Sequence, residues 1–204
     1  MSHRVARQLV PAVLAATGAL LVVGFLAELG FGLVHQQQLD QRWRQSLTSS
    51  PAPALPRDPV QTPAPVDGVD FAVRVPRLGY FAAVGEGVDS DVLINGPGHY
   101  PKTPWPGQPG NVGVAAHNTY WIRFGDLRPG DEIDLETRYG TYKYVVTGTR
   151  IVPADDRTVL APTAGKQLTL TTCWPLWAGA FAQERLAIFA LQVFPKPPVP
   201  TQTS

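Results

Sequence analysis

A long uncharged segment near the amino terminus constrains this chain more than any other feature. Residues Leu9–Ala27 carry no charged side chain, and apolar character resumes after Glu28 and continues to Val34. Because a helix rises about 1.5 Å per residue, roughly 20 such residues cross the hydrocarbon core of a bilayer. A cleaved signal peptide usually has a shorter apolar region, about 7–15 residues, followed by a small-residue cleavage site. No convincing site follows here, so we predict an uncleaved transmembrane signal-anchor over residues 9–34.

The charges around this segment predict its orientation. Arg4 and Arg7 precede it, which favours a cytoplasmic location for residues 1–8 and a location outside the cell for the rest of this single-pass chain. Arg42 and Arg44 follow it, so the charge bias is modest. A buried core helix is the alternative, which the length and terminal position of the segment disfavour.

Proline-rich segments divide the rest of the chain. Residues 35–47 are polar and compatible with an extension of the anchor helix, whereas residues 48–68 are dense in Pro, Ser and Ala. Such a composition cannot build a core, and proline favours extended geometry. We therefore predict an extracellular Pro-rich spacer over residues 35–69, a catalytic domain over residues 70–194 and a Pro-rich tail over residues 195–204.

Short alternating segments dominate the predicted domain. Phe71, Val73 and Val75 alternate with Ala72 and Arg74, which is the period-two pattern of a half-buried strand. Segments with turn residues between them indicate an all-β fold, here a closed or nearly closed β-barrel. The predicted strands are Phe71–Val75, Tyr80–Val84, Asn111–His117, Glu132–Thr137, Thr141–Val152, Gln167–Cys173 and Arg185–Val193, with short helical turns around Asp89–Leu93 and Thr158–Leu160.

Composition excludes one class of partner. The chain has 204 residues and a formal net charge of +1. Nucleic-acid binding needs a basic stripe or groove, which this sequence does not offer, so we predict no nucleic-acid partner. The most promising acidic pair for a metal is Asp155-Asp156, and a solvated turn explains it better. We therefore predict no metal site and no cofactor.

Cys173 is the one cysteine of the chain, so it cannot form an internal disulfide. It ends a predicted strand in which Leu168 and Leu170 share one face and the thiol belongs to the polar face. Trp174-Pro175 then stops the strand, so the thiol lies at a rigid end where a side chain can meet substrate. A buried structural cysteine and a reactive one are about equally supported by this feature alone.

A nucleophilic thiol needs a base, because the thiolate is the reactive form and an unperturbed cysteine has a pKa near 8.5. His3 and His35 flank the predicted membrane span, and His99 lies in a predicted loop. His117 ends a predicted apolar strand in the same way as Cys173, so the two side chains can meet at one rim of a barrel. A polar residue that merely caps its strand is the alternative role for His117.

Arg185 opens the last predicted strand, next to a nearly continuous apolar run. In acyl transfer, a cation in such a position can stabilise the negative charge that develops on the carbonyl oxygen. A solvated arginine paired with Glu184 is the alternative.

Taken together, these features resemble the sortase family, and most closely the class E sortases of high-GC Gram-positive bacteria. The resemblance spans the predicted domain, and its residue types occur in the order His, Cys, Arg. The matching motifs, in chain order, are VPRLGY, NGPGHYPKT, PGQPGNVGVAAHNTY, DLRPGDEI, VTGTRIV and LTTC followed by Trp-Pro and a later Arg-Leu.

The resemblance implies an eight-stranded β-barrel and a two-step exchange at the cell membrane. Cys173 would attack the Thr-Gly bond of a Leu-Ala-x-Thr-Gly sorting signal, with His117 as base or acid and Arg185 beside the oxyanion. An amine of a lipid-linked peptidoglycan precursor would then resolve the thioester. The implied partners are secreted proteins that carry this signal. Tyr100 matches the family's signal-selecting tyrosine, and Trp174 is a second substrate-binding candidate.

The sequence also departs from the family pattern. Ala116 and Asn118 flank His117 where glycine and arginine are common, and Trp174 stands where smaller or polar residues are frequent. Trp174 and Trp177 either line an apolar groove for the leucine of the signal or pack on the barrel, and we favour packing.

Two other functions stay open at this point. The first is a thiol peptidase that passes the acyl group to water, because acceptor choice depends on loop geometry. The second is a catalytically silent, anchored scaffold or adhesion domain in which the three residues are incidental. An L,D-transpeptidase is disfavoured, because its Ser-His-Gly-Cys cluster is absent from the sequence.

Overall fold

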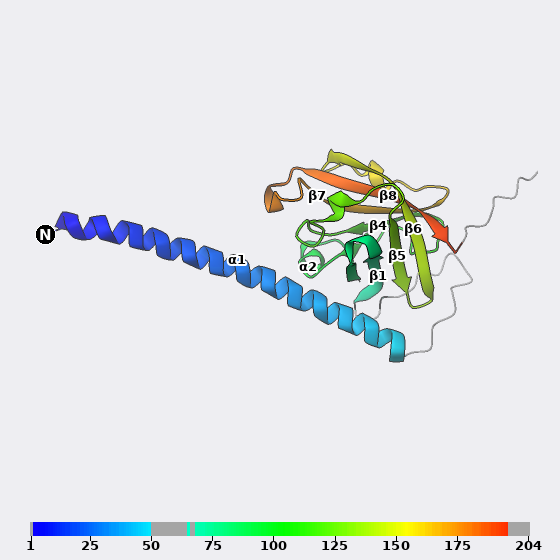
Figure 1. Cartoon of the computed structure of the whole chain (residues 1–204), viewed down its shortest axis with the longest axis horizontal. Coiled ribbons are helices and arrows are strands. Elements are labelled where there is room, and N and C mark those ends of the chain that lie inside the picture. Colours follow the sequence, from blue (N-terminus) through cyan, green and yellow to red (C-terminus); the bar gives the residue numbers. More distant parts are fainter. Residues whose placement is uncertain (1, 50–64, 66–67, 196–204) are drawn as a thin grey trace, which may run out of the picture.

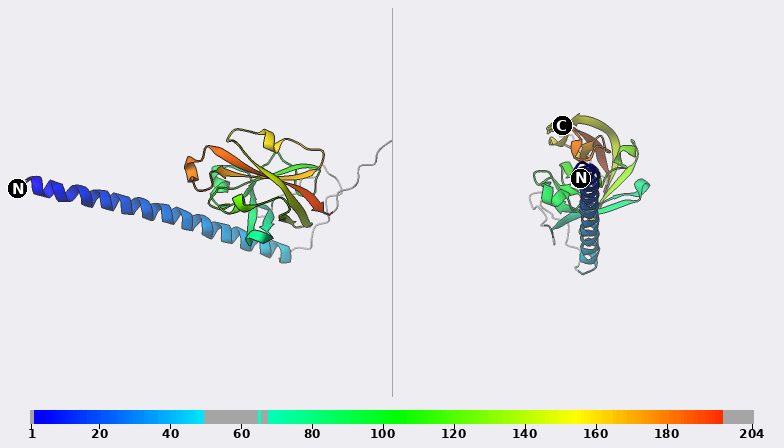
Figure 2. Two further views of the ribbon diagram at one scale, coloured as in Figure 1. Left: turned by 45° about the horizontal axis from the view of Figure 1, so that its top comes forward. Right: turned by 90° about the vertical axis from the view of Figure 1, so that its left-hand side faces the viewer.

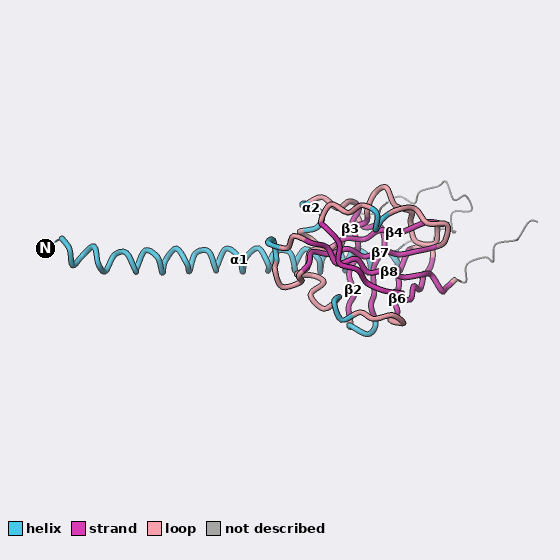
Figure 3. The backbone as a smooth tube through the Cα atoms, turned by 90° about the horizontal axis from the view of Figure 1, so that it is seen from above, coloured by secondary structure: helices cyan, strands magenta, loops and turns pink. Residues whose placement is uncertain are grey.

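The computed structural model describes residues 2–49, 65 and 68–195, which form one long helix and a β-barrel. The helix, α1 (Ser2–Ser49), runs along one side of the barrel and projects far beyond it (Figures 1 and 3). By length and composition, the described helix over Val13–Thr48 could cross a membrane, and the large apolar side chains described between Val13 and Val34 are exposed.

The eight strands of the described residues close into a barrel in the order β1-β2-β3-β4-β7-β8-β6-β5. Neighbouring strands are antiparallel except for the parallel pairs β2–β3 and β4–β7. The predicted eight-stranded β-barrel is therefore confirmed. The strands are β1 (Val69–Val75), β2 (Tyr80–Glu86), β3 (Gly98–His99), β4 (Gly110–Ala115), β5 (Glu132–Thr137), β6 (Gly140–Pro153), β7 (Lys166–Trp174) and β8 (Glu184–Phe194).

Short helical segments connect the strands. The predicted helical turns are present as α2 (Ser90–Leu93) and η3 (Thr158–Leu160), and three further turns are η1 (Pro76–Leu78), η2 (Phe124–Asp126) and η4 (Gly179–Phe181). The sequence patterns did not predict β3, because two residues show no periodicity. A Cβ atom on Gly98 of β3 would lie 2.0 Å from the carbonyl oxygen of Gly87, so only glycine permits this close approach.

Strand alternation separates an inner and an outer face around β7. Leu168 and Leu170 are fully buried in the main core, as the alternation of the sequence predicts. A second, smaller cluster lies on the outer face, where η3 covers the sheet. Its members are Val152, Val159 and Ala187, with Leu160 and Phe189 packed against them. The barrel thus carries a covered outer surface over β4, β7 and β8.

The carboxy-terminal part of α1 packs against β1 and β2 (Figure 2). The side chain of Gln36 donates a hydrogen bond to the carbonyl oxygen of Ala83 over 3.3 Å. The Ala83 N–H donates to the Asp40 carboxylate over 2.7 Å. Trp43 is fully buried, and the guanidinium of Arg138 lies 4.8 Å from the centre of its ring. These contacts attach the helix to the barrel.

The first residues of the predicted spacer are therefore part of α1. Residues 35–49 are helical and contribute to the packed interface, because Trp43 supplies a large apolar anchor that a Pro-rich linker lacks. Residues 50–64 and 66–67 of the predicted spacer lie outside the described residues, as do residues 196–204 of the predicted tail.

Candidate active site

The parallel pairing of β4 with β7 aligns His117 with Cys173. Ala115 is the register partner of Thr171, and the Ala116 N–H donates to the Thr171 carbonyl oxygen over 3.2 Å. His117 and Cys173 each lie two residues beyond that pair. Because parallel strands end at the same edge of a sheet, the two side chains belong to one end of the barrel.

The antiparallel pairing of β7 with β8 adds Arg185 to this end. Cys173 and Arg185 are direct register partners, and directly opposite residues project from the same face of a sheet. The neighbouring Leu186 belongs to the main core, so Arg185 projects outward. We call the end of the sheet that carries His117, Cys173 and Arg185 the site rim.

His117 is half-buried, and no hydrogen bond to its ring is found among the described residues. Burial lowers the pKa of its imidazole, and the positive charge of Arg185 lowers it further. At neutral pH the imidazole is therefore uncharged, which is the form that accepts a proton. The dependence on Arg185 also indicates that the two side chains lie close enough for their charges to interact.

Arg185 and Cys173 are both half-buried, so each is accessible at the site rim. Arg185 donates a hydrogen bond from Nη1 to the carbonyl oxygen of Glu184 over 3.0 Å. Among the salt bridges of the described residues, none joins the Arg185 guanidinium to the Glu184 carboxylate. The guanidinium therefore keeps donors free to meet a developing oxyanion.

Tyr100 lies on the same outer face, beside the strand that carries the thiol. Its hydroxyl forms a hydrogen bond with Thr171 Oγ1 over 2.9 Å, and its N–H donates to the Gly113 carbonyl oxygen over 3.0 Å. Thr171 precedes Cys173 by two residues and shares its face. The structure thus brings Tyr100 to the surface that leads to the site rim.

Trp174 and Trp177 differ in their surroundings. Trp174 is half-buried and packs against the main core, in agreement with the interpretation we favoured. Trp177 is 83% exposed and does not pack on the barrel. The two residues, with Phe181 and others of the β7–β8 loop, line a hollow of about 470 Å³ next to Glu184. Trp174 therefore borders open space as well as the core.

Gly113 forms the floor of the outer face, a role that sequence reasoning missed. A Cβ atom there would lie 2.9 Å from both Leu160 Cδ2 and Tyr100 Cδ2, and 3.1 Å from Thr103 Cγ2. These side chains come from the loops that cover β4. Glycine in a strand interior often marks such a close approach, which is the sequence signal that could have identified it.

His99 is a structural residue. Its Nδ1 lies 2.9 Å from Asp70 Oδ2, and its Nε2 lies 3.1 Å from both the Pro104 carbonyl oxygen and Thr103 Oγ1. His99 and Asp70 are both buried. Both ring nitrogens have protein partners, so this histidine is not available to a substrate.

Asn118, which follows His117, is also buried, and its Nδ2 has no hydrogen-bond partner among the described residues. Its backbone carbonyl accepts a hydrogen bond from the Trp121 N–H over 3.2 Å. The departure from the family pattern at this position therefore places an amide inside the turn after β4.

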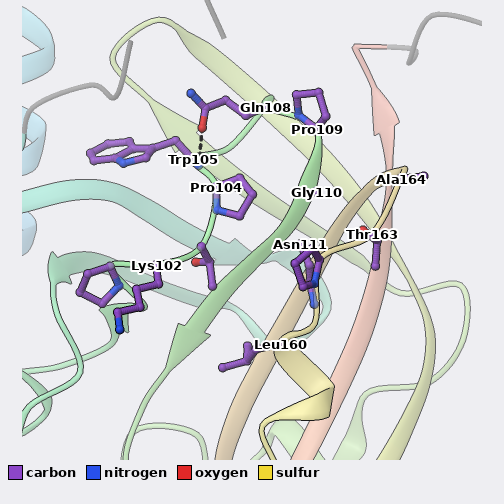
Figure 4. Close-up of a pocket in the computed structure, with 13 residues that line it drawn as sticks. Lys102, Pro104, Trp105, Gln108, Pro109, Gly110, Asn111, Leu160, Thr163 and Ala164 are labelled. Atoms are coloured by element: carbon purple, nitrogen blue, oxygen red, sulfur yellow. Dashed lines mark hydrogen bonds between the residues drawn. The ribbon is translucent and has the colours of Figure 1, made fainter. Parts of the chain in front are cut away.

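A larger hollow of about 690 Å³ lies at the opposite end of β4 and β7 (Figure 4). Gly110 and Asn111, at the start of β4, line it together with Lys102, Leu160 and Thr163. It begins at the strand end away from the site rim and extends to Leu160, which also meets Gly113. Among the described residues, no group of three or more His, Cys, Asp or Glu side chains could hold a metal ion.

A closed barrel with a thiol, an imidazole and a guanidinium at one rim defines a class of candidate cysteine acyl-transfer proteins. Comparison with known proteins gives the family. The family model described as the sortase domain matches residues 73–193. This chain belongs to the sortase family.

The individual relatives agree with this assignment. Sortase D of Bacillus subtilis is 32% identical over 123 residues, which cover 59% of this chain and 62% of that protein's length. The structure of sortase E from Streptomyces avermitilis is 35% identical, with a TM-score of 0.53, and the match covers 62% of this chain and 90% of the other. The Sortase D5 transpeptidase of Clostridium perfringens, at 22% identity, shares the fold with a TM-score of 0.64 over 78% of this chain and 99% of the other.

Proposed function

We propose that this protein is a membrane-anchored cysteine transpeptidase that cleaves a carboxy-terminal sorting signal between Thr and Gly and joins the protein to a cell-wall amine. The observation that supports this most directly is the strand register: Cys173 pairs with Arg185, and His117 lies at the same strand end. Membership of the sortase family supports the same reaction type.

In the first step, the neutral imidazole of His117 accepts the thiol proton, and the sulfur of Cys173 attacks the threonine carbonyl carbon. The guanidinium of Arg185 stabilises the resulting oxyanion. The carbon–nitrogen bond then breaks, and the glycine amine leaves with the proton that His117 carries. The product is a thioester between the threonine and Cys173.

In the second step, an amine attacks the thioester carbonyl and loses a proton to His117. The carbon–sulfur bond breaks, and the proton returns to the thiolate. Dividing one amide exchange into two acyl transfers lowers each barrier. The acceptor we propose is an amine of a lipid-linked peptidoglycan precursor, because α1 holds the enzyme at the membrane that carries such a molecule.

The substrates we propose are secreted proteins with a Leu-Ala-x-Thr-Gly signal. Tyr100 borders the outer face beside Thr171, and Trp174 borders the hollow next to the site rim, so each is a candidate contact for the signal. Arg4 and Arg7 before the uncharged segment support a single-pass topology with the barrel outside the cell.

The test uses the full chain in lipid nanodiscs with a fluorogenic Leu-Ala-x-Thr-Gly peptide, with and without an added amine. We expect cleavage between Thr and Gly, an amine adduct of the threonine fragment, and a thioester adduct by mass spectrometry. Cys173→Ala should abolish all three, whereas Val193→Ala, at an exposed position at the far end of β8, serves as a matched folded control.

The alternatives predict other results. Cleavage without an adduct for any amine indicates a peptidase that uses water. A folded protein whose thiol resists alkylation and forms no thioester indicates a silent scaffold. Cleavage that persists in Cys173→Ala rejects the proposed nucleophile.

A further inference from the structure

α1 reaches the barrel close to the site rim. Gly32 is buried, and a Cβ atom there would lie 2.7 Å from Tyr120 Oη and 2.9 Å from the carbonyl oxygen of Ile94. Tyr120 also donates its hydroxyl to that carbonyl, and its N–H donates to the His117 carbonyl oxygen over 3.1 Å. This contact of the helix with the barrel therefore lies within a few residues of the candidate base.

The distance from this contact to the uncharged segment is short. Leu9–Ala27 carries no charge, and the helix continues without interruption from Ala27 to Gly32. At 1.5 Å per residue, the contact lies about 8 Å along the helix from the end of the uncharged segment. Because Gly32 is buried against the barrel, the last residues of the predicted anchor over residues 9–34 do not lie in the bilayer. If the uncharged segment spans the bilayer, the barrel is held against the membrane surface with the site rim on the side that faces it.

The β7–β8 loop lies at the same end of the barrel and is unusually apolar. Residues 174–183 contain no charged side chain. Trp177 and Phe181 are 83% and 89% exposed, more than Leu20 of the membrane segment at 73%. In two views, this loop, drawn in orange between β7 and β8, projects from the barrel toward the amino-terminal end of α1 (Figures 1 and 2).

We propose that the β7–β8 loop inserts Trp177 and Phe181 into the interface of the bilayer that α1 spans, so that the site rim works at the membrane surface. Tryptophan is enriched at this depth because its ring is apolar and its N–H is polar. Ile122 follows Tyr120 by two residues, and the carbonyl oxygen of Ile94 accepts the hydrogen bond from the Tyr120 hydroxyl. Both isoleucines are exposed and extend the apolar surface on the same side.

A lipid surface fits this loop better than a protein partner does. If α1 spans the membrane, the bilayer lies next to the loop, because the helix joins the two over a short distance. A protein partner would have to enter the narrow space between barrel and membrane. The absence of charge over residues 174–183 also allows the two aromatic rings to reach the apolar side of the interface without carrying a charged group into the hydrocarbon, where it would be costly. The proposal rests on α1 spanning the membrane and is independent of catalysis.

The test measures contact between Trp177 and lipid by fluorescence. The full chain, as the silent Cys173→Ala variant, is placed in nanodiscs of ordinary lipid or of lipid brominated on its acyl chains, which quenches nearby indoles. We expect quenching in the brominated discs and the loss of most of it in Trp177→Phe. Trp43, Trp105 and Trp121 are buried and should contribute little, and half-buried Trp174 is present in every variant and sets the background.

A relocated reporter is the matched control. Phe194 is 56% exposed at the far end of β8, so Trp177→Phe combined with Phe194→Trp moves the indole away from the site rim without changing the number of tryptophans. We expect an aqueous quencher to reach this reporter and the brominated lipid not to quench it. Circular dichroism of each variant checks that it is folded.

Two results overturn the proposal: quenching that is unchanged in Trp177→Phe, or equal quenching of the reporters at 177 and 194. If the native chain does not cleave the peptide but the Cys173→Ala chain shows lipid quenching of Trp177, the proposed function is contradicted and this inference stands. If the native chain cleaves the peptide and the quenching is not seen, this inference is contradicted and the proposed function stands.

Discussion

Two histidines of this barrel have opposite surroundings. His99 is buried with both ring nitrogens engaged, by Asp70 on one side and by Pro104 and Thr103 on the other. His117 is half-buried at the site rim, and its ring has no hydrogen bond among the described residues. The ring of His99 connects strands through its partners, whereas the ring of His117 has the free nitrogens that the proposed base requires.

The comparison is most strongly tested by removing the imidazole at the rim. His117→Ala should reduce kcat/KM of peptide cleavage by about 10²–10⁴-fold, because the proton transfer loses its acceptor. Its free energy of unfolding should change by about 0.5 kcal/mol or less, since no hydrogen bond is lost. Steady-state cleavage and denaturant unfolding of the same preparation measure both. A large loss of stability with unchanged turnover reverses the roles of the two histidines.

The same substitution at the buried histidine should have the opposite profile. His99→Ala leaves the buried Asp70 carboxylate without its partner, which costs about 3–5 kcal/mol of unfolding free energy. The melting temperature should fall by about 10 °C or more. Cleavage per folded molecule should persist at low temperature. His117→Ala is the matched control, and equal melting temperatures for the two variants contradict the distinction.

Sequence alone could not make this distinction. His99 stands between Gly98 and Tyr100 in a segment without periodicity, and its partner Asp70 is far away in the chain. A two-residue strand is formed by tertiary pairing with β2 and β4, and no local pattern encodes it. The packing of α1 on the barrel could not be predicted either, because it depends on contacts of Trp43 with residues that are distant in the chain.

The predictable parts were those with a local signal. Alternation located the other strands and gave the inner face of Leu168 and Leu170. The resemblance to sortases gave the residue types of the candidate site. The alignment of these residues depends on the parallel register of β4 with β7. This pairing joins segments that are distant in the chain, so no local periodicity encodes the register. Their catalytic roles remain predictions.

The outer face that leads from Tyr100 to the site rim can be tested through Gly113, which forms its floor. Gly113→Val should push the covering side chains of Leu160 and Tyr100 outward, at a cost of about 1–3 kcal/mol from overpacking, and should raise KM for the peptide. Gly148→Val is the matched control, because a Cβ atom there meets nothing within 4 Å. Equal KM values for the two variants indicate that the signal does not bind on this face.

A titration of His117 tests how the charge of Arg185 affects the pKa of this histidine. Burial is the larger cause of the lowered pKa of His117, and Arg185 is the second, so Arg185→Gln should raise this pKa without restoring the ordinary value. Arg185→Lys should keep it low. NMR titration of the His117 ring measures the effect. A pKa that does not rise in Arg185→Gln contradicts the proximity of the two side chains.

The sign of the stability change follows from the same shift. Because the folded state lowers the pKa of His117, the unfolded state binds more protons, so this group disfavours folding as pH falls below its unfolded value near 6.5. His117→Ala should therefore weaken the loss of stability between neutral and mildly acidic pH. Denaturant unfolding at both pH values measures it, and an unchanged pH dependence contradicts the buried, uncharged state of the ring.

The smallest effect we expect concerns Tyr100, which follows the structural histidine and bonds to the strand of the thiol. Tyr100→Phe removes the hydroxyl that meets Thr171 Oγ1, and Thr171 is buried, so unfolding free energy should fall by about 0.5–1.5 kcal/mol. Thr171→Val removes the other partner, and a double-mutant cycle isolates the pair. If Tyr100 also contacts the signal, Tyr100→Phe raises KM more than Thr171→Val does. Equal KM changes mean that the Tyr100 hydroxyl only stabilises β7 and does not contact the signal, so that its role is structural like that of His99.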